Sequence, residues 1–139
     1  MANILLVEDD DGDAMLTEGR LKEADGKVDV WRAHDGADAL AMLDNGDFTP
    51  DLILLDINMP GMDGHETLAK LRADARFSKT PIVILTTSSS RRDIKRAYES
   101  CANAYVMKPV TLDAFRDTVG TIKKFWTQTA FLPGAVVNG

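Results

Sequence analysis

The sequence predicts an α/β fold: a single doubly wound (βα)5 domain on a five-stranded parallel sheet. Five short apolar runs alternate along the chain with segments of helical pattern. Three of these runs are apolar at consecutive positions and rich in branched side chains, which is typical of strands covered on both faces. The length of 139 residues is about that of one domain. Strands joined by helices in this way imply right-handed crossovers.

The apolar runs are the expected strands. The second run is the weakest, because Asp29 interrupts it. In chain order the runs are Ile4–Val7, Val28–Trp31, Leu52–Leu55, Ile82–Leu85 and Ala104–Met107.

The segments between and after the runs are expected to be helices, each with a capping residue at its start. In chain order the expected caps are Asp11, Asp35, Asp63, Ser90 and Thr111. Asp63 and Ser90 each precede an acidic residue by three positions, as in a capping box. The first helix, near 12–24, has the least regular apolar pattern.

The last two expected helices carry clear apolar stripes. One stripe consists of Ile94, Ala97, Tyr98 and Cys101, and the other of Leu112, Phe115, Val119, Ile122 and Trp126. The first stripe predicts that Cys101 lies in the core.

Composition excludes several classes of protein. The single cysteine rules out an internal disulfide and a multi-cysteine metal site. No apolar run approaches the roughly 18 residues that span a bilayer, and no signal peptide is visible, so we expect a cytoplasmic protein without a membrane partner. The net charge of −6 argues against a nucleic-acid surface.

The residues that end the strands carry the chemistry. Ligands of an open parallel sheet bind beyond the carboxyl ends of its strands. The polar residues at these ends are Glu8, Asp9, Asp10, Asp56, Thr86, Thr87 and Lys108. Clustered carboxylates repel one another unless a cation joins them, and oxygen ligands with room for water suit Mg²⁺. Mg²⁺ and an ammonium group both attract phosphoryl oxygens, and Asp56 can hold an acyl phosphate.

Four segments resemble the receiver domain of response regulators, the CheY-like module of two-component signalling. They are Leu6–Asp10, Leu54–Gly64, Leu85–Thr87 and Tyr105–Pro109, in the order and spacing of that family. The resemblance covers residues 1 to about 127. It implies the flavodoxin-like strand order 2-1-3-4-5.

The resemblance also implies a role for each matching residue. Asp56 matches the phosphoacceptor, which receives its phosphoryl group from a sensor histidine kinase. Asp9 matches the direct Mg²⁺ ligand, and Glu8 is expected to act on the ion through water. Asn58 matches the position whose backbone carbonyl completes the metal site. Lys108 matches the lysine that pairs with the phosphoryl oxygens.

The same resemblance implies a conformational switch. Thr86 matches the hydroxyl that turns towards the phosphoryl group, and Tyr105 matches the aromatic residue that then rotates inward. The surface from residue 88 to about 120 is expected to change as a result. Pro109 stands where receivers carry a cis peptide bond, which would aim Lys108 inward.

Further segments are similar to a subgroup, the stand-alone regulators paired with bacterial and cyanobacterial phytochrome histidine kinases. These segments are Leu85–Ser88, Asp93–Ile94, Ala102–Tyr105, Lys108–Val110, Phe125–Trp126 and Leu132–Pro133. The similarity implies light signalling and homodimerisation. We therefore divide the chain into a receiver domain, 1–127, and a C-terminal extension, 128–139, interpreted as a dimerisation arm. With no DNA-binding domain after residue 127, the output is expected to be a protein contact or onward phosphotransfer.

Competing interpretations stay open at this point. A Mg²⁺-dependent phosphohydrolase would need a second acid near Asp56, where Asn58 stands. A flavodoxin-like cofactor binder would need a glycine-rich phosphate loop that the sequence lacks. A constitutive protein-binding module is a third alternative. We favour a phosphoacceptor over an enzyme with its own substrate. His34 and His65 are interpreted as surface residues, and the basic run 91–96 as a solvated helix face.

Overall fold

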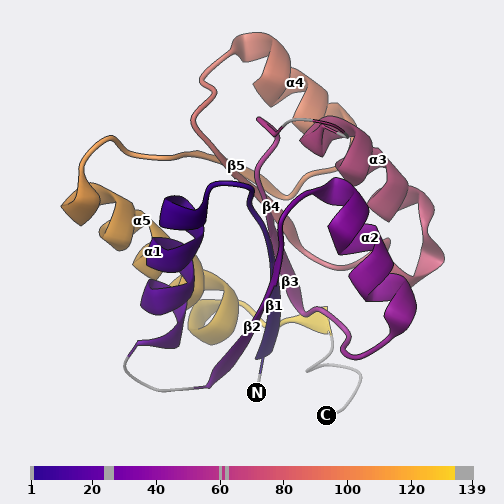
Figure 1. Cartoon of the computed structure of the whole chain (residues 1–139), viewed down its shortest axis with the longest axis horizontal. Coiled ribbons are helices and arrows are strands. Elements are labelled where there is room, and N and C mark those ends of the chain that lie inside the picture. The colour runs from indigo at the N-terminus through magenta and orange to yellow at the C-terminus, as the bar shows by residue number, and fades with distance from the viewer. Residues whose placement is uncertain (1, 24–26, 60, 62, 134–139) are drawn as a thin grey trace.

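The computed structural model describes residues 2–23, 27–59, 61 and 63–133. A five-stranded sheet forms its centre (Figure 1). The strands are β1 (Ala2–Val7), β2 (Val28–Ala33), β3 (Leu52–Leu55), β4 (Ile82–Thr86) and β5 (Ala104–Met107). They lie in the order β2-β1-β3-β4-β5, and every neighbouring pair is parallel. Both the fold class and the strand order predicted above are confirmed.

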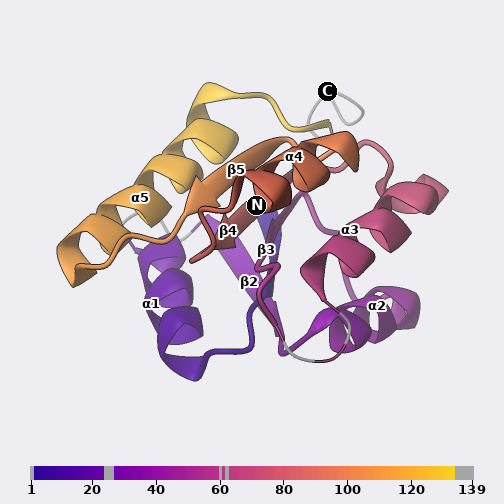
Figure 2. The same ribbon diagram turned by 90° about the horizontal axis from the view of Figure 1, so that it is seen from above.

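Helices cover the sheet on both faces. They are α1 (Asp11–Lys22), α2 (Gly36–Asn45), α3 (Gly64–Ala73), α4 (Arg91–Glu99) and α5 (Leu112–Lys124), with a short 3₁₀ turn at Ala75–Phe77 after α3. Helices α1 and α5 lie on one face, and α2, α3 and α4 lie on the other (Figure 2). The sheet is therefore buried from both sides.

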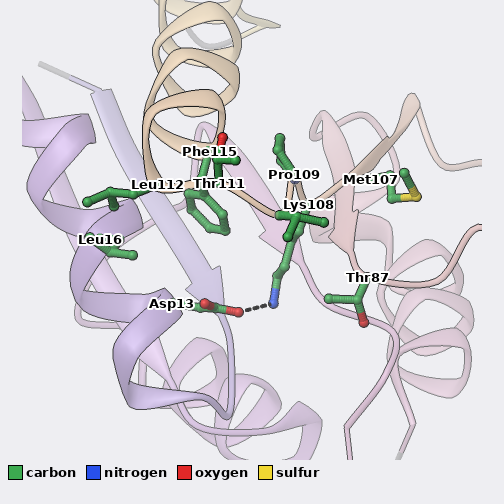
Figure 3. Close-up of a pocket in the computed structure, with 10 residues that line it drawn as sticks. Asp13, Leu16, Thr87, Met107, Lys108, Pro109, Thr111, Leu112 and Phe115 are labelled. Atoms are coloured by element: carbon green, nitrogen blue, oxygen red, sulfur yellow. Dashed lines mark hydrogen bonds and ion pairs between the residues drawn. The ribbon is translucent and has the colours of Figure 1, made fainter.

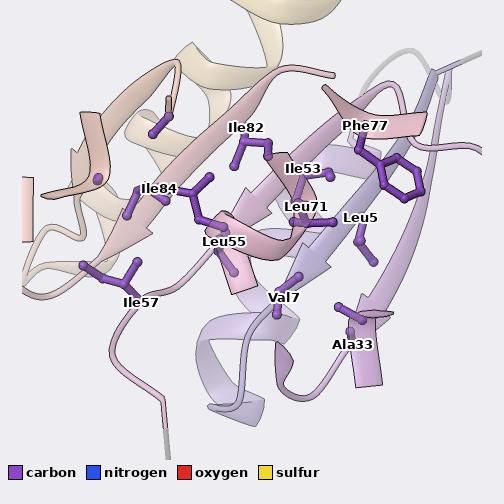
Figure 4. Close-up of a cluster of buried hydrophobic side chains, with 14 of the residues drawn as sticks. Leu5, Val7, Ala33, Ile53, Leu55, Ile57, Leu71, Phe77, Ile82 and Ile84 are labelled. Atoms are coloured by element: carbon purple, nitrogen blue, oxygen red, sulfur yellow. The ribbon is translucent and has the colours of Figure 1, made fainter. Parts of the chain in front are cut away.

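Alternation along β1 divides the core into two clusters. Leu5 and Val7 point into the cluster under α2, α3 and α4, which Figure 4 shows. Ile4 and Leu6 point into the cluster under α1 and α5. Strands β3 and β4 are buried at every position, as continuous apolar runs predict. This leaves the strand ends as the place where polar side chains meet.

Side-chain caps begin the helices as expected, with one exception. Asp35, Asp63, Ser90 and Thr111 each accept a hydrogen bond from the backbone N–H three residues later. The prediction of Asp11 as the cap of α1 is wrong. Asp10 caps this helix by accepting from the N–H of Asp13, because Asp10 has extended backbone and Asp11 is already helical.

The prediction that Cys101 lies in the core is also wrong. Helix α4 ends at Glu99, and Cys101 follows it with a φ of 68° and an exposed side chain. Only Ala97 of the expected stripe is fully buried, and Tyr98 is exposed. The left-handed turn at Cys101 instead brings Ala102 under the helix, where its N–H donates to the carbonyl of Ala97.

The C-terminal end continues α5 into a wider helical turn, Phe125–Thr129. Trp126 is half-buried and packs on the cluster beneath α1 and α5. Phe125 contacts Trp126 edge to face, and both Phe125 and Phe131 are exposed. The expected boundary at residue 127 falls inside this turn, and the valines of the expected arm, 136 and 137, lie outside the described residues. No helix in the described part of the chain is long and apolar enough to cross a membrane.

Candidate functional site

Three strand ends bring ionisable side chains together at one edge of the sheet. Glu8 follows β1, Asp56 follows β3 and Lys108 follows β5. All three side chains are buried, with 2–6% of each residue exposed. Burying charged groups is costly unless they pair with one another. The three side chains must therefore pair with opposite charges within the site.

The ammonium group of Lys108 is the centre of the pairing. Its Nζ atom lies 2.5 Å from Glu8 Oε1, 2.9 Å from Asp13 Oδ2 and 3.0 Å from Asp56 Oδ2. The three N–H bonds of the ammonium group are thus matched by three carboxylates. Figure 3 shows Lys108 facing Asp13 of α1 across a pocket. Sequence reasoning missed Asp13, although its place in the first turn after the acidic strand end was an available signal.

Excess negative charge remains in the site. Burial raises the pKa of Glu8 to about 7, and the charge of Asp56 adds to the rise while Lys108 opposes it. The carboxylates around Lys108 raise its pKa against the effect of burial, so the lysine stays protonated. One ammonium facing three carboxylates favours the uptake of a cation.

The site offers a suitable set of ligands for that cation. Oxygen atoms of Glu8, Asp9 and Asp56 lie within 4.8 Å of one another. Carboxylate oxygens, with Asp9 exposed to water, fit a hard divalent cation such as Mg²⁺. The backbone N–H of Asn58 donates to Asp56 Oδ1 at 2.9 Å and holds that carboxylate in place.

The two expected switch residues flank the loop after β4. Thr86 is fully buried at the end of that strand. Tyr105 is half-buried on β5, and its hydroxyl donates to the carbonyl of Ser88 at 2.8 Å. Burial raises the pKa of Tyr105, so its hydroxyl keeps the proton that it donates. The N–H of Ser88 faces the hydroxyl of Thr86 at 3.5 Å, so both residues contact the same short loop, 87–90.

The expected cis peptide bond before Pro109 is wrong. Every peptide bond in the described residues is trans, including Lys108–Pro109. The trans form is the ordinary preference of such bonds, by about 0.5–1 kcal/mol. Lys108 needs no cis bond to point inward, because its N–H extends the pairing with β4 by donating to the Thr86 carbonyl at 2.7 Å.

One histidine differs from expectation. His34 is exposed beside Asp38, as predicted. His65, interpreted above as a surface residue, is only 5% exposed and lies 3.0 Å from Asp93. The reason is Gly64, which lets the start of α3 rest directly on the backbone of residues 56 and 57.

The expected solvated face of α4 is confirmed, since Arg91, Arg92, Lys95 and Arg96 are exposed.

Comparison with known proteins places this geometry in a family. The family model of the response regulator receiver domain matches residues 4–120. The chain belongs to this family. Receiver domains work in phosphorylation-based signalling, receive phosphoryl groups from sensor histidine kinases, bind divalent metal ions and are generally phosphoacceptors rather than enzymes.

Individual relatives cover almost the whole chain. The response regulator Rcp1 of Synechocystis is 36% identical over 95% of this chain and 93% of its own length. The probable methanogenesis regulatory protein FilR2 of Methanothrix harundinacea is 35% identical over 94% and 87% of the two chains. The crystal structure of the phosphorylated cyanobacterial phytochrome response regulator RcpA superposes with a TM-score of 0.92 at 36% identity, covering 95% and 98%. Rcp1 is also known in a Mn²⁺-bound form, which superposes with a TM-score of 0.91 at 35% identity over 96% and 99%.

Proposed function

We propose that this receiver accepts a phosphoryl group from a sensor histidine kinase on the carboxylate of Asp56. The carrying observation is the pairing of the buried Asp56 with Lys108 beside the acidic cluster. In the transfer, the bond from phosphorus to the kinase's histidine nitrogen breaks and a bond to an Asp56 oxygen forms. Lys108 then moves from the carboxylates towards the phosphoryl oxygens, whose charge it offsets.

We assign the metal to Glu8, Asp9, Asp56 and the backbone carbonyl of Asn58, and the ion to Mg²⁺. When bound, this ion supplies positive charge for the phosphoryl oxygens. The chain's own residues do the rest. Asn58 orients Asp56 through its N–H, and Lys108 holds a second positive charge opposite the acidic cluster. Slow attack of water on the acyl phosphate resets the module, so the protein catalyses only its own modification.

The readout uses Thr86 and Tyr105. The phosphoryl group brings new charge and acceptor oxygens close to the end of β4. The Thr86 hydroxyl turns towards them, and the loop 87–90 follows because it contacts both switch residues. The consequence is a population shift at the surface of α4, β5 and α5.

An apolar pocket beside the site suits the kinase. The cavity has a volume of about 390 Å³ and lies between α1 and the β5–α5 connection (Figure 3). Met107, Val110 and Leu112 line it and are more than half exposed. Exposed apolar groups around a charged centre are typical of a protein-binding surface. We propose that the kinase's histidine-bearing helices dock here.

The upstream signal and the assembly are finer proposals. Similarity to Rcp1 and RcpA supports a phytochrome kinase as donor and light as the stimulus. Exposed Phe125 and Phe131 support a homodimer formed through the C-terminal extension 128–139. A downstream protein or phosphotransfer partner reads the α4, β5 and α5 surface. The single exposed cysteine suits a reducing, cytoplasmic location.

Phosphotransfer tests the proposal. A bacterial phytochrome kinase, first labelled on its own histidine with radioactive ATP, is mixed with this protein and Mg²⁺. The proposal expects the label to move to wild-type protein and to stay on the kinase when Asp56→Asn is used. Transfer of the label to the Asp56→Asn variant as well as to wild type would overturn the assignment of Asp56. Transfer only from kinases of other sensor classes would overturn the phytochrome link alone. Light scattering of the same samples measures the dimer.

A further inference from the structure

A hydrogen-bonded chain joins α3 to the switch loop. His65 Nε2 lies 3.0 Å from Asp93 Oδ1 at the start of α4. The hydroxyl of Ser88 donates to the other oxygen of Asp93 at 2.6 Å. The backbone carbonyl of Ser88 accepts the hydroxyl proton of Tyr105 at 2.8 Å. His65, Asp93 and Ser88 are called the clasp below.

The direction of each bond in the clasp is fixed. Hydrogen bonds from Ser88 first and from His65 second lower the pKa of Asp93, so its carboxylate is ionised and only accepts. His65 must therefore carry a proton on Nε2. Its other nitrogen, Nδ1, is buried and has no hydrogen-bond partner in the described parts of the chain. A buried imidazole held by one bond depends on that bond for its position.

The clasp is also connected to the phosphoacceptor. A Cβ atom on Gly64 would lie 2.5 Å from the carbonyl oxygen of Asp56 and closer still to the Cα of Ile57. The N–H of Gly64 also faces the Ile57 carbonyl at 3.4 Å. The start of α3 thus packs directly on the backbone around Asp56, and His65 is the next residue. A displacement of the backbone at residues 56 and 57 therefore shifts His65 and, through the bonds of Asp93, also Ser88.

We propose that His65 is a positioning residue of the switch: through Asp93 it holds Ser88, and so the carbonyl that accepts the hydroxyl proton of Tyr105. This inference rests on the proposed function, because it names what couples the phosphoacceptor loop to the switch aromatic. Loss of the His65 bond frees Ser88, and the population of Tyr105 that is hydrogen-bonded to the Ser88 carbonyl falls. The expected change in the ratio of hydrogen-bonded to released Tyr105 is about two- to tenfold, as for one net hydrogen bond.

The test reads Tyr105 directly in the unphosphorylated protein. The sequence has two tyrosines, so incorporation of 3-fluorotyrosine gives two ¹⁹F resonances, and Tyr105→Phe identifies that of Tyr105. His65→Leu is expected to move this resonance towards its value in urea. His65→Gln, which keeps an N–H donor, should restore the wild-type position. His34→Leu removes the exposed histidine and is the matched control that leaves the resonance unchanged.

A second variant covers the case in which His65→Leu fails to fold. Ser88→Ala removes the hydroxyl of the clasp and keeps the backbone carbonyl that accepts from Tyr105. It should move the Tyr105 resonance in the same direction as His65→Leu. A wild-type resonance in Ser88→Ala, or in a folded His65→Leu protein, would overturn the proposal.

The lifetime of the acyl phosphate gives a second test, independent of the ¹⁹F resonance. His65→Leu should change the lifetime of the acyl phosphate in the wild-type background and have no effect in the Tyr105→Phe background. Equal effects in both backgrounds would mean that His65 acts on stability alone, contrary to the proposal. If wild-type protein accepts no phosphoryl group, the proposed function fails, and the ¹⁹F result still decides on the clasp.

Discussion

Gly64→Ala tests whether the start of α3 sets the position of the phosphoacceptor. The added Cβ would lie 2.5 Å from the carbonyl oxygen of Asp56 and closer still to the Cα of Ile57, whereas ordinary contact begins at 3.4 Å. Both neighbours are backbone atoms, so no side-chain rotation relieves the clash. The start of α3 and the segment 56–57 must therefore separate by about 1 Å, a shift at which catalytic groups lose up to ~10²-fold in rate.

The energetic cost follows from the same geometry. Overpacking of a filled site costs about 1–3 kcal/mol. For a domain of this size, a loss of about 2 kcal/mol lowers the midpoint of urea unfolding by about 1 M. We expect Gly64→Ala to show this loss and to be phosphorylated by acetyl phosphate at least about tenfold more slowly than wild type.

Gly19→Ala is the matched control. Gly19 lies in α1, and a Cβ atom added there would have no neighbour within 4 Å. Alanine favours helix over glycine by up to about 1 kcal/mol, so this variant should be as stable as wild type or more stable. Wild-type stability and wild-type phosphorylation in Gly64→Ala would refute the close packing of α3 on residues 56 and 57.

Three further predictions concern the charges around Lys108. Lys108→Met should lower the rate of phosphorylation by acetyl phosphate about 10²-fold, the typical loss of one positioned donor. Lys95→Met, which changes an exposed lysine, should keep the wild-type rate. Equal phosphorylation rates in the two variants would contradict the role of Lys108. Asp13→Asn should keep Mg²⁺ affinity within about twofold of wild type, because Asp13 pairs with Lys108 and lies outside the acidic cluster. A large loss of Mg²⁺ affinity in calorimetric titration would instead make Asp13 a metal ligand. Mg²⁺ affinity should rise up to about tenfold per pH unit as pH approaches 7 and then level off, because the ion displaces the proton of Glu8, whose pKa is about 7. A flat pH profile of the affinity in wild type, or a profile that Glu8→Gln leaves unchanged, would count against this.

The sign of the Glu8 effect on stability follows from the same pKa. The folded protein holds a proton on Glu8 between about pH 4.5 and 7 that the unfolded chain has released. The contribution of this group to the free energy of unfolding therefore falls as pH rises through that window. Urea unfolding without metal, compared between wild type and Glu8→Gln, measures it.

The sequence predicted the architecture because the fold depends on local patterns. Continuous apolar runs at β3 and β4 required cover on both faces, and side chains such as Asp35 and Thr111 cap helices through neighbouring backbone groups. The convergence of Glu8, Asp56 and Lys108 followed from parallel topology alone. These features needed no knowledge of distant packing.

The features that sequence reasoning missed depend on tertiary contacts. The burial of His65 results from the close packing of Gly64 on another segment of backbone. The pairing of Asp13 with Lys108 joins residues 95 positions apart. Cys101 left the core because α4 ends two residues before it, and helix ends are the least certain part of any periodic pattern. None of these contacts leaves a periodic signal in the sequence.

We propose above all that Asp56 accepts one phosphoryl group with the help of a divalent cation. The direct measurement is the intact mass of the protein after incubation with acetyl phosphate and Mg²⁺, beside Asp56→Asn and a sample with chelator. We expect one labile phosphoryl group per chain in wild type and none in the other two samples. No added mass in folded wild-type protein, or the same added mass in Asp56→Asn, would contradict it.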